Sequence, residues 1–345
     1  MSSVVRASTP ADQDAITALF RKAGLRPNAE PQQLHWKYWL EREDFPGPRS
    51  FVLCEGPEII AHAGIVPGNC ISTRGRRRLM HLIDWAALPG ATGAGVALMK
   101  HIGQNVDALL AIGGSKDTLR LLPHLGFRGV GEALIHARPL HPLQILRQRS
   151  GTAWKRIPRV IRSGIWNWLA PRARSSEMKF ARLGANELDS IAGVFPTPAA
   201  TGDVIERSVA GLRYFLACPI VQVALFSISQ SGRPRGYTLL AYTPGQVRLA
   251  DCWIDSESPE DWQTLINCAV QAARQWPDAA ELITWSSDAQ HAANLRACGF
   301  HVRMHLPVSL RFRIREAGAA TAPIRVQMLD NDAAYHFQGR AQLWA

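Results

Sequence analysis

The stretch that decides the fold is Leu79-Met-His-Leu-Ile-Asp-Trp-Ala-Ala-Leu-Pro-Gly-Ala-Thr-Gly-Ala-Gly-Val-Ala-Leu-Met-Lys100. Its apolar run with polar insertions predicts a strand as far as Pro89, and the apolar residues after Gly95 recur at helical spacing. Glycines between the two elements allow a tight turn, because glycine tolerates positive φ. The first amides of a helix have no acceptor within it, so such a turn can hold an anion, typically a phosphate. The alternative is an ordinary strand-to-helix turn built from small residues.

Two familiar phosphate motifs do not fit this turn. The stretch has no Gly-Lys-Ser or Gly-Lys-Thr, which a P-loop requires. It also lacks the acidic residue that follows about twenty residues later, after a second parallel strand, in a dinucleotide-binding unit. The surrounding elements must therefore decide what the turn does.

The composition is that of a globular protein with room for two domains. The chain has 345 residues, of which 47% are hydrophobic and 19% charged, and a domain typically holds about 100–200 residues. The first residues lack the apolar core of a signal peptide, and no apolar run approaches the roughly 18–20 residues of a membrane span. The six cysteines are scattered, which favours free thiols in a reducing cytoplasm over a zinc site. We expect a cytoplasmic protein without a metal.

The net charge of +11 is concentrated in one segment. Residues 141–176 contain eight Lys or Arg side chains and no Asp or Glu, which leaves +3 for the rest of the chain. Three tryptophans are interleaved with these cations, a composition typical of helices at a membrane surface. Pro158 and Gly164 argue against one continuous helix. The alternatives are a solvated linker packed across two domains and, ranked lower, a segment that binds nucleic acid.

The predicted elements occur twice in the same order. The first half predicts strand 4–7, a helix after Pro10, an aromatic helix 34–40, hairpin 50–55 with 59–66, the strand-turn-helix stretch, strand 108–114, helix 115–125 and strand 130–140. The second half predicts strand 180–182, helix 187–195, hairpin 221–229 with 237–242, strand 247–254, helix 262–275, strand 281–285, helix 291–298 and strand 302–313. Matching anchors lie 173 to 176 residues apart, which indicates two copies of one domain.

Three short motifs stand within this order. The chain opens with Arg6-Ala-Ser-Thr-Pro10, carries Gly90-Ala-Thr-Gly93-Ala-Gly95 after the long strand, and ends the last short helix with Leu125-Gly-Phe127. Motifs and order together resemble the GCN5-related N-acetyltransferase (GNAT) superfamily, whose pyrophosphate loop has Arg or Gln where this chain has Gly90. The resemblance covers residues 4–140 and, more weakly, 178–313, and the doubled arrangement is similar to tandem members such as mycothiol synthase. It implies an α/β fold with two tandem GNAT-like domains, each a mixed central sheet flanked by helices.

The resemblance also implies an acyl-coenzyme A donor, most simply acetyl-CoA, and no metal. By position, the backbone of Trp85 and Ala87 would run beside the pantetheine arm. The backbone N–H groups of the turn and helix start would hold the pyrophosphate, and the residues concerned are Gly90, Gly93, Ala94, Gly95 and Val96, with Ser115 as a further contact at the next helix start. Core packing is the alternative role for Trp85.

Transfer of an acyl group to an amine needs a base for the amine proton and an acid for the leaving thiolate. The superfamily often has a tyrosine acid four residues before the Gly of Gly-Phe, where this chain has Leu122. Asp84 is the leading candidate base, because a carboxylate within an apolar strand is costly unless it has a role. Its alternative is a structural carboxylate. His81, which alternation puts on the opposite face of the strand, and His124, on the last short helix, are the further candidates.

The second half lacks the glycine turn. At the corresponding place the sequence reads Asp255-Ser-Glu-Ser-Pro-Glu-Asp261, whose four carboxylates would repel a pyrophosphate. We therefore expect this half to have lost coenzyme binding and to supply part of a substrate cleft. Asp251 and Trp253 would line that cleft or pack in the core.

The sequence thus predicts an acyl-CoA-binding domain at 1–140, a basic linker at 141–176, a degenerate second GNAT domain at 177–316 and a tail at 317–345 with one short strand. The expected function is acyl transfer to an amine or hydroxyl of a small molecule or saccharide precursor. The alternatives are aminoacyl transfer from tRNA, as in FemABX enzymes, and a binding module that keeps the fold without catalysis. We expect a peripheral contact of the basic linker with an anionic membrane, at its inner face, and rank nucleic acid below it.

Overall fold

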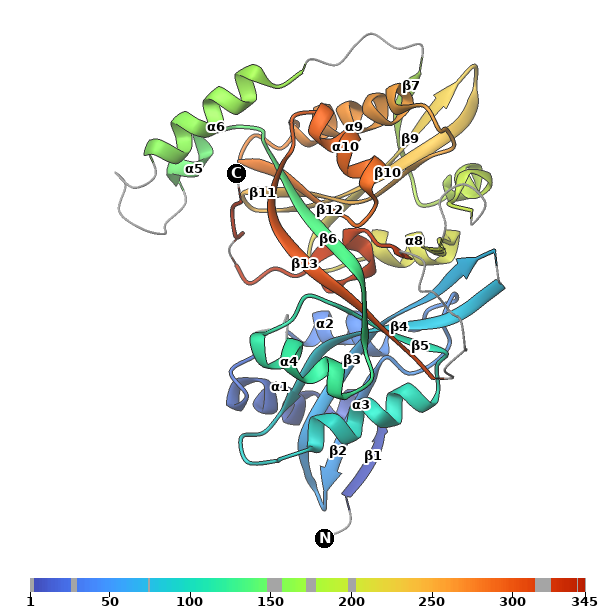
Figure 1. The fold of residues 1–345 in the computed structure, drawn as a ribbon, viewed down its shortest axis with the longest axis vertical. Coiled ribbons are helices and arrows are strands. Elements are labelled where there is room, and N and C mark those ends of the chain that lie inside the picture. Colours follow the sequence, from blue (N-terminus) through green and yellow to red (C-terminus); the bar gives the residue numbers. More distant parts are fainter. Residues whose placement is uncertain are drawn as a thin grey trace.

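One mixed sheet runs through the whole molecule in the computed structural model (Figure 1). The structure describes residues 3–25, 30–73, 75–147, 157–171, 178–197, 203–313, 324–339 and 341–344. The strands of the main path follow the order β1-β2-β3-β4-β5-β13-β6-β12-β11-β10-β9-β7, and β8 and β14 attach beside β3. Helices flank the sheet in both halves, which is the predicted tandem α/β architecture.

The first half follows the predicted order closely. Its strands are β1 (Ser3–Ala7), β2 (Ser50–Glu55), β3 (Glu58–Ser72), β4 (Gly75–Ala87), β5 (Ala108–Ile112) and β6 (Arg128–Pro139), and its helices are η1 (Pro10–Asp12), α1 (Gln13–Lys22), α2 (Pro31–Leu34), η2 (His35–Trp39), α3 (Ala94–Gln104) and α4 (Lys116–His124). The predicted aromatic helix is one α-helical turn followed by a turn of π-helix, η2. This turn buries Trp36, Lys37 and Tyr38.

The second half repeats the plan and adds short elements that the sequence did not reveal. Its strands are β7 (Lys179–Leu183), β8 (Asp203–Ile205), β9 (Gln222–Gln230), β10 (Arg233–Thr243), β11 (Gln246–Ile254), β12 (Glu281–Ser286), β13 (His301–Phe312) and β14 (Ile324–Arg325), and its helices are η4 (Leu188–Val194), α8 (Val209–Leu216), α9 (Pro259–Ala273), α10 (Ala289–Ala297), η5 (Met328–Asp330) and η6 (Asp332–Ala334). The predicted helix 187–195 is a 3-10 helix, η4. Helix α8 was missed although Ser208 caps it by accepting a hydrogen bond from the Gly211 amide.

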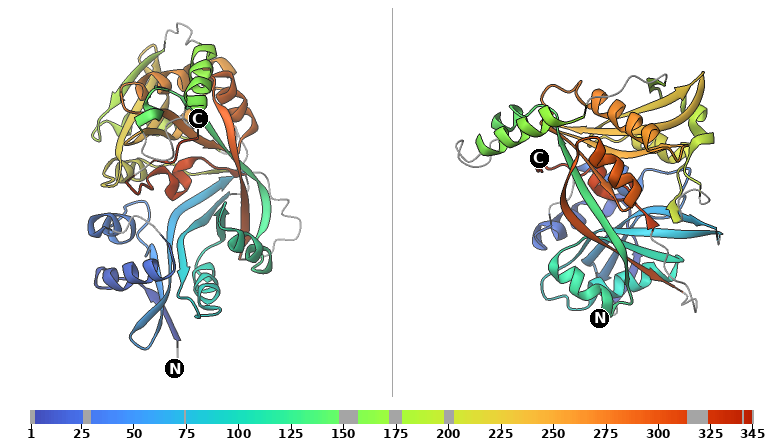
Figure 2. Two further views of the ribbon diagram at one scale, coloured as in Figure 1. Left: turned by 90° about the vertical axis from the view of Figure 1, so that its left-hand side faces the viewer. Right: turned by 45° about the horizontal axis from the view of Figure 1, so that its top comes forward.

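The two halves exchange their last strands. Strand β13 of the second half pairs with β5 of the first, from Val308–Ile112 to Phe312–Ala108, and β6 of the first half pairs with β12 of the second. The exchanged strands also pair with each other, and they cross diagonally between the halves in Figures 1 and 2. The predicted boundary at residue 140 therefore follows a strand whose two partners both belong to the second half.

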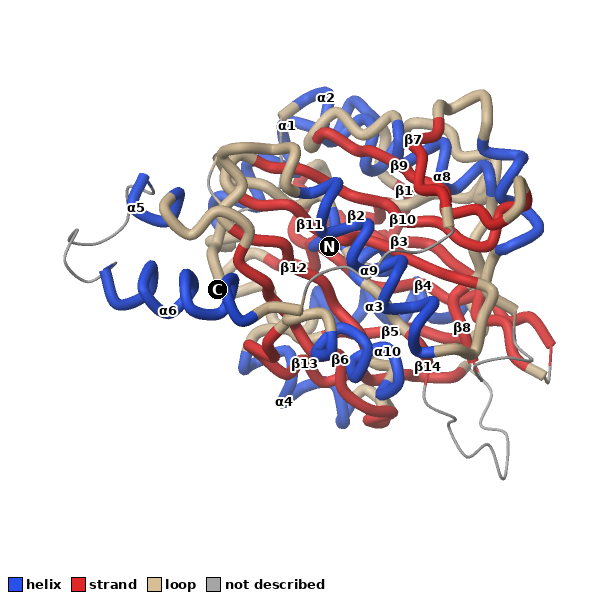
Figure 3. Tube along the Cα trace, turned by 90° about the horizontal axis from the view of Figure 1, so that it is seen from above, coloured by secondary structure: helices blue, strands red, loops and turns tan. Residues whose placement is uncertain are grey.

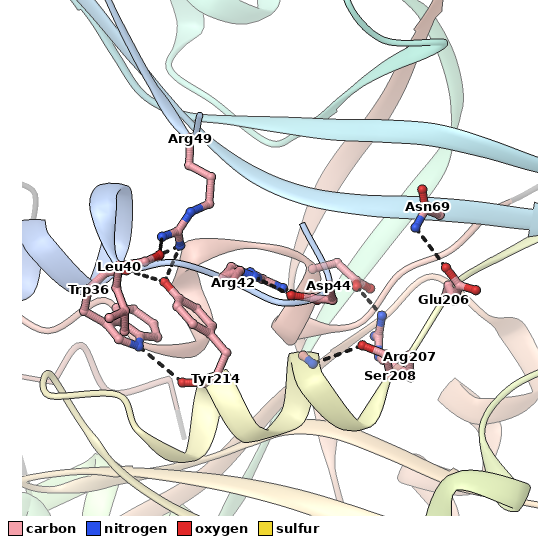
Figure 4. A network of polar contacts seen from close by, with 12 residues as sticks. Trp36, Leu40, Arg42, Asp44, Arg49, Asn69, Glu206, Arg207, Ser208 and Tyr214 are labelled. Carbon is pink, nitrogen blue, oxygen red and sulfur yellow. Dashed lines mark hydrogen bonds and ion pairs between the residues drawn. The ribbon is translucent and has the colours of Figure 1, made fainter. Parts of the chain in front are cut away.

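A second contact between the halves involves η2 of the first half and α8 of the second. Trp36 stacks on Tyr214 of α8 with ring centroids 4.7 Å apart, and its indole N–H donates to the Tyr214 carbonyl at 3.2 Å. Arg49 donates to the Tyr214 hydroxyl at 2.6 Å (Figure 4). Trp36 thus lies in the same apolar cluster as the core of the second half. Strand exchange and this contact hold the halves in one arrangement.

The basic linker contains one continuous helix, contrary to the expectation from its Pro and Gly. Helix α6 (Ile157–Leu169) follows the short α5 (Gln144–Arg147), and the two helices stand out from the body of the molecule in Figure 3. Pro158 occupies the first turn, where its missing N–H costs no helical hydrogen bond. Gly164 lies mid-helix and costs only about 1 kcal/mol relative to alanine.

Candidate functional site

The first half has an opening in its sheet between two parallel strands. Strands β4 and β5 pair only from Leu79–Ala108 to His81–Leu110, and beyond these residues they diverge. Strand β5 continues against β13 on its other edge. Strand β4 continues against β3, where a bulge interrupts the register between His62 and Gly64. The backbone of β4 from Leu82 onward therefore faces the gap with its edge unpaired.

Asp84 sits in this bulge with an unusual backbone conformation. Its φ of 47° is left-handed, which non-glycine residues rarely adopt. Bulges at the edge of an opening re-aim side chains and end pairing. The bulge therefore both ends the pairing with β5 and turns the Asp84 side chain into the interior.

A cavity of about 400 Å³ fills the opening. It takes its walls from both halves, because the exchanged strands and the tail close it. The lining residues are His81, Leu82, Ile83, Asp84, Trp85, Ala111, Ile112, Gly113, Gly114, Thr118, Leu122, Ile135, Trp285, Met304, Leu306, Asn331, Asp332 and Trp344. Most of the wall is apolar, and its titratable side chains are the carboxylates of Asp84 and Asp332 and the imidazole of His81.

The predicted glycine turn follows β4 and leads into α3. Gly90 and Gly93 have φ of 90° and 82°, so the turn requires glycine at both positions. The Trp85 indole N–H donates to the Gly95 carbonyl at 2.9 Å and joins the cavity wall to the first turn of α3. The Ala94 amide already donates to the Ala91 carbonyl at 3.2 Å, so the first-turn amides without a helical acceptor are those of Gly95 and Val96.

The other predicted coenzyme contacts lie on either side of this turn. Ala87 ends β4 opposite Ala61 of β3 and is half-buried. Ser115 caps α4 and accepts a hydrogen bond from the Thr118 amide at 3.1 Å. Thr118 itself lines the cavity, so the start of α4 faces the opening from the β5 side.

Asp84, the leading candidate base, is held by a buried cation and a phenol. Its carboxylate forms an ion pair with Lys37 and accepts a hydrogen bond from the Tyr38 hydroxyl at 2.5 Å. Burial raises the pKa of Asp84, but the charge and hydrogen bond of Lys37 outweigh it, and the pKa lies below its usual value. A carboxylate with a lowered pKa is a weaker proton acceptor. This geometry favours the structural alternative for Asp84.

His62 and His81 are both buried beside the opening. His62 donates from Nδ1 to the Asp84 carbonyl at 3.0 Å and accepts from Ser50, and burial lowers its pKa to about 4. His81 donates from Nδ1 to the Leu110 carbonyl at 3.0 Å, and its Nε2 accepts from the Asn331 amide at 2.6 Å. Burial also lowers the pKa of His81. His81 is thus a neutral imidazole with both ring nitrogens occupied.

His124 and Leu122, two further residues singled out in the sequence, differ in their position relative to the cavity. His124 lies exposed at the end of α4 and, among the described residues, is not part of the cavity wall. Leu122, which occupies the position of the superfamily's usual tyrosine acid, is buried and lines the cavity. The structure therefore brings Asp84, His81 and Leu122 together and leaves His124 outside.

Sequence reasoning missed the contribution of the tail. Asn331 and Asp332 reach the cavity from the far end of the chain, and Trp344 also lines it. Asp332 is half-buried, and the described residues include no ion-pair partner for its carboxylate. Its charge raises the pKa of His81 against the effect of burial, which places it close to that ring. The only sequence signal for this site was the cluster of polar residues at 330–332.

The second half has the same opening, but its own tail fills it. Strands β11 and β12 pair from Gln246–Glu281 to Arg248–Ile283 and then part. The Gln327 amide accepts from the Cys252 N–H at 3.1 Å and donates to the Cys252 carbonyl at 3.0 Å. On the β12 side, Ser287 bonds to the backbone of Ile324 and Val326, each at 2.8 Å. Residues 324–330 therefore span the gap from β11 to β12.

Aromatic and charged groups anchor this segment. The Arg325 guanidinium lies over the rings of Trp253 and Trp262, 4.7 and 4.8 Å from their centroids. Asp330 accepts from Arg207 at 2.7 Å, and Arg207 also binds Asp251 with two hydrogen bonds of 2.9 Å. Asp251 and Trp253, predicted to line a cleft or to pack, are both buried under the tail.

A second cavity of about 360 Å³ lies between the halves and meets the first at His81. Its walls carry carboxylates and guanidinium groups. Figure 4 shows the pair of Arg42 with Asp44 and the hydrogen bond from Asn69 to Glu206. Glu206 also pairs with Arg76, and Arg207 pairs with Asp330. Glu43 adds an exposed carboxylate at the same cavity. A polar molecule in this cavity would lie next to the opening between β4 and β5.

The described residues contain no group of three His, Cys, Asp or Glu side chains placed to hold a metal ion. Within the same residues, no helix has the length and apolar character needed to cross a membrane.

Comparison with known proteins gives a fold and no sequence relative. No protein-family model and no curated protein sequence matches the chain. Three solved structures align over 90% of it. The first is a conserved protein of unknown function from Enterococcus faecalis, described as a probable N-acyltransferase (TM-score 0.59, 13% identity, 73% of that chain covered). The others are GCN5-related N-acetyltransferases from Anabaena variabilis (0.59, 12%, 73%) and Kribbella flavida (0.55, 12%, 71%).

At these identities the likeness concerns the fold, and it covers both halves. The predicted GNAT fold is confirmed, whereas the likeness to mycothiol synthase stays a prediction. The chain therefore has the fold of the GCN5-related N-acetyltransferases, built as two tandem copies on one continuous sheet.

Proposed function

We propose that this protein is an acyltransferase that takes acyl-CoA, most simply acetyl-CoA, into the opening between β4 and β5. It passes the acyl group to an amine or hydroxyl of a small molecule or saccharide precursor. The observation that carries the proposal is the open, 400 Å³ gap beside a glycine turn in the first half, set against a filled gap in the second. Three solved structures with this fold, two of them named N-acetyltransferases, support the same reaction class.

The coenzyme site is supported by backbone groups rather than side chains. The edge of β4 from Leu82 to Trp85 has no strand partner on the β5 side, and its backbone groups, apart from the Asp84 carbonyl that accepts from His62, are offered to the amides of pantetheine. The amides of Gly95 and Val96, at the N-terminus of an eleven-residue helix, suit the pyrophosphate. The coenzyme supplies an activated thioester, and the chain orients it with its sulfur toward Leu122 and the tail.

The second cavity suits the acceptor. It meets the coenzyme opening at His81, and its walls carry four carboxylates, each already paired with an arginine: Glu43, Asp44, Glu206 and Asp330. Carboxylates attract a protonated amine and accept hydrogen bonds from sugar hydroxyls. Its volume of about 360 Å³ fits a small molecule, at the lower end of ordinary ligand pockets.

We assign the role of general base to Asp332 and a positioning role to Asp84. Asp332 lines the cavity as a carboxylate with no ion-pair partner among the residues that the structure describes, so it can accept the proton of the attacking amine or hydroxyl. Asp84 stays ionised under Lys37 and keeps β4 bulged, while Asn331 keeps His81 neutral. With Leu122 in place of a tyrosine, the coenzyme leaves as a thiolate that takes its proton from solvent.

Calorimetry with acetyl-CoA tests the coenzyme site. Wild type should bind one equivalent. Gly93→Asp should lower the affinity by about a hundredfold, because it puts a carboxylate beside the pyrophosphate. Gly232→Asp is the matched control: Gly232 has φ of 79° and, like Gly93, open space for a side chain, but it lies in the β9–β10 turn. Two equal sites in wild type, or equal affinity in both variants, would refute the proposal.

Release of free CoA in the presence of candidate amines and amino sugars tests the transfer. Turnover with such an acceptor supports the acyltransferase. Tight acetyl-CoA binding without release would point to a binding module. Co-purification of tRNA with an empty acetyl-CoA site would point to aminoacyl transfer.

A further inference from the structure

Helices α5 and α6 take no part in the site described above. They extend from the end of β6 and project away from both halves, as Figures 1 and 3 show. Helix α6 contacts β6 and α5 along one side. Its other side faces solvent.

The outer side of α6 is apolar. Residues at positions i, i+4, i+8, i+11 and i+12 fall on one helical face. All five are at least half exposed: Ile157 (52%), Ile161 (57%), Ile165 (51%), Trp168 (81%) and Leu169 (64%). Leu143 and Leu146, next to and within α5, are exposed as well. A contiguous apolar stripe about 20 Å long differs from scattered exposed residues and marks an interaction surface.

The inner side of α6 holds the helix in this orientation. Trp166 stacks on His301 of β13 with ring centroids 3.9 Å apart, and Arg162 lies over the same indole. The Asn167 side chain accepts from Arg274, the residue that follows α9, at 2.9 Å, and Ser163 is fully buried. These contacts leave the apolar stripe facing outward.

The charge around the stripe selects its partner. Residues 141–176 carry eight cations and no acid, and among them Arg147 and Arg159 are exposed beside the stripe. An isologous contact between two copies would bring these like charges together. A nucleic acid would engage the cations and leave the five apolar side chains in water. An anionic lipid surface accommodates both features, because cations meet the headgroups while apolar side chains enter the interface.

A polar cavity of about 560 Å³ lies beneath the same helix. Arg138 and Arg274 line it together with Asn167, Gln271 and Trp168, and its described wall contains no Asp or Glu. Arg138 is only 3% exposed, and neither its Nε nor that of Arg274 has an acceptor among the described residues. Two guanidinium groups with unused donors suit a phosphate. Since Trp168 belongs to both the stripe and the cavity wall, the cavity borders the surface where lipid would lie.

We propose that α6 lies in the plane of an anionic phospholipid surface, with its apolar stripe at headgroup depth and one lipid phosphate in the cavity between Arg138 and Arg274. This surface is separate from both cavities of the proposed acyltransferase. It holds the protein at the surface reversibly, because a single thirteen-residue helix inserts only one face.

Co-sedimentation with vesicles tests the apolar stripe. Wild type should sediment with phosphatidylglycerol–phosphatidylcholine vesicles at low salt, much less at high salt, and not with phosphatidylcholine alone. Ile161→Glu should lower the partition coefficient by about tenfold or more. Val4→Glu is the matched control, since Val4 is an exposed apolar residue (54%) on β1 at a distant edge. Equal losses of vesicle binding in the two variants would show that only net charge matters. That result would contradict the insertion of the apolar stripe into the lipid surface.

A second pair of variants tests the phosphate cavity. Arg147→Gln removes one exposed charge and should weaken binding about fivefold. Arg274→Gln removes one charge from the cavity while its amide can still donate to Asn167, and it should weaken binding more. Equal effects would overturn the cavity. Wild type that stays in the supernatant at low salt overturns the whole proposal. In that event, a change of oligomeric state in Ile161→Glu would assign the stripe to a second copy, and co-purified RNA would assign the cations to nucleic acid.

Discussion

The two halves part their central parallel strands at the same place and use the gap in opposite ways. In the first half the gap between β4 and β5 is a cavity with a glycine turn at its end. In the second half the gap between β11 and β12 is closed by Gln327, whose amide makes both hydrogen bonds with Cys252. The second gap ends at an acidic loop that caps α9 through Ser258. The fold is thus complete with the gap open or filled, so the open gap is not a requirement of the fold.

The buried aspartates, unlike the gaps, have the same kind of surroundings in both halves. Asp84 pairs with Lys37 and Tyr38 in the first half, and Asp251 pairs with Arg207 and Tyr237 in the second. The same carboxylate, cation and phenol therefore occur where the gap is filled and no substrate can enter. Because the second half has this group of side chains without an open gap, the group is a feature of the fold and not of substrate binding.

The largest effect should come from Asp332, the tail carboxylate that lines the open gap of the first half. Asp332→Asn should lower turnover by about 10²–10⁴-fold at saturating acetyl-CoA, the usual size of a lost general base, with coenzyme affinity unchanged. Initial rates of CoA release and calorimetry on the same sample measure the two quantities. Full activity of this variant would exclude Asp332 as the base.

Exchanging each buried aspartate for asparagine compares the halves directly. Asp84→Asn leaves Lys37 buried without its charge partner and should cost about 3–5 kcal/mol of unfolding free energy. Asp251→Asn should cost less, because Arg207 keeps Asp330. Urea unfolding of both variants measures the difference. An Asp84→Asn protein that is as stable as wild type but inactive would restore Asp84 as the base.

A pH dependence should arise at the position where the halves differ. His62 stands in the first half where Tyr237 stands in the second, and its pKa falls from 6.5 to about 4 in the fold. Between these two pH values the unfolded chain binds a proton that the folded chain does not bind. The contribution of His62 to the free energy of unfolding is therefore complete above pH 6.5 and is lost as the pH falls toward 4. The loss should approach about 3 kcal/mol. Urea unfolding across this range should give a shallower slope for His62→Gln, and an unchanged slope would contradict the assignment.

The smallest effect should come from Gln327, the tail residue that closes the gap of the second half. Gln327→Leu keeps the shape but leaves the Cys252 N–H and C=O without partners, at a cost of about 1–3 kcal/mol. Because the acidic loop remains, we expect no second acetyl-CoA site in this variant. A second site seen by calorimetry would mean that the tail alone closes the second half.

Prediction from sequence worked best where the signal was local. The glycine turn, the strands on either side of it and the doubled order all appear in the structure, because dihedral preference and apolar periodicity act over a few residues. Leu122, interpreted from the sequence as standing where the superfamily often has a tyrosine acid, lies in the cavity wall. Prediction failed for α6, where Pro158 and Gly164 were weighed as helix breakers although a first-turn proline breaks nothing.

The side chain that pairs with Asp84 and the tail carboxylate in the cavity wall could not be predicted from local patterns. Lys37 lies in an aromatic helix with nothing to mark it as the partner of Asp84, and Asp332 lies 248 residues from Asp84 in a tail without a motif. Their pairing depends on contacts between distant segments, which local patterns do not encode.

By itself, the sequence determined the α/β class, the two copies, the single glycine turn and the concentration of charge in 141–176, since each is a property of neighbouring residues. Only the tertiary structure decided that β6 and β13 change places and that the tail fills one gap and lines the other. The physical reason is that strand edges and buried polar groups accept any geometrically suitable partner. The packing of the whole chain determines which partner binds a given strand edge or buried polar group.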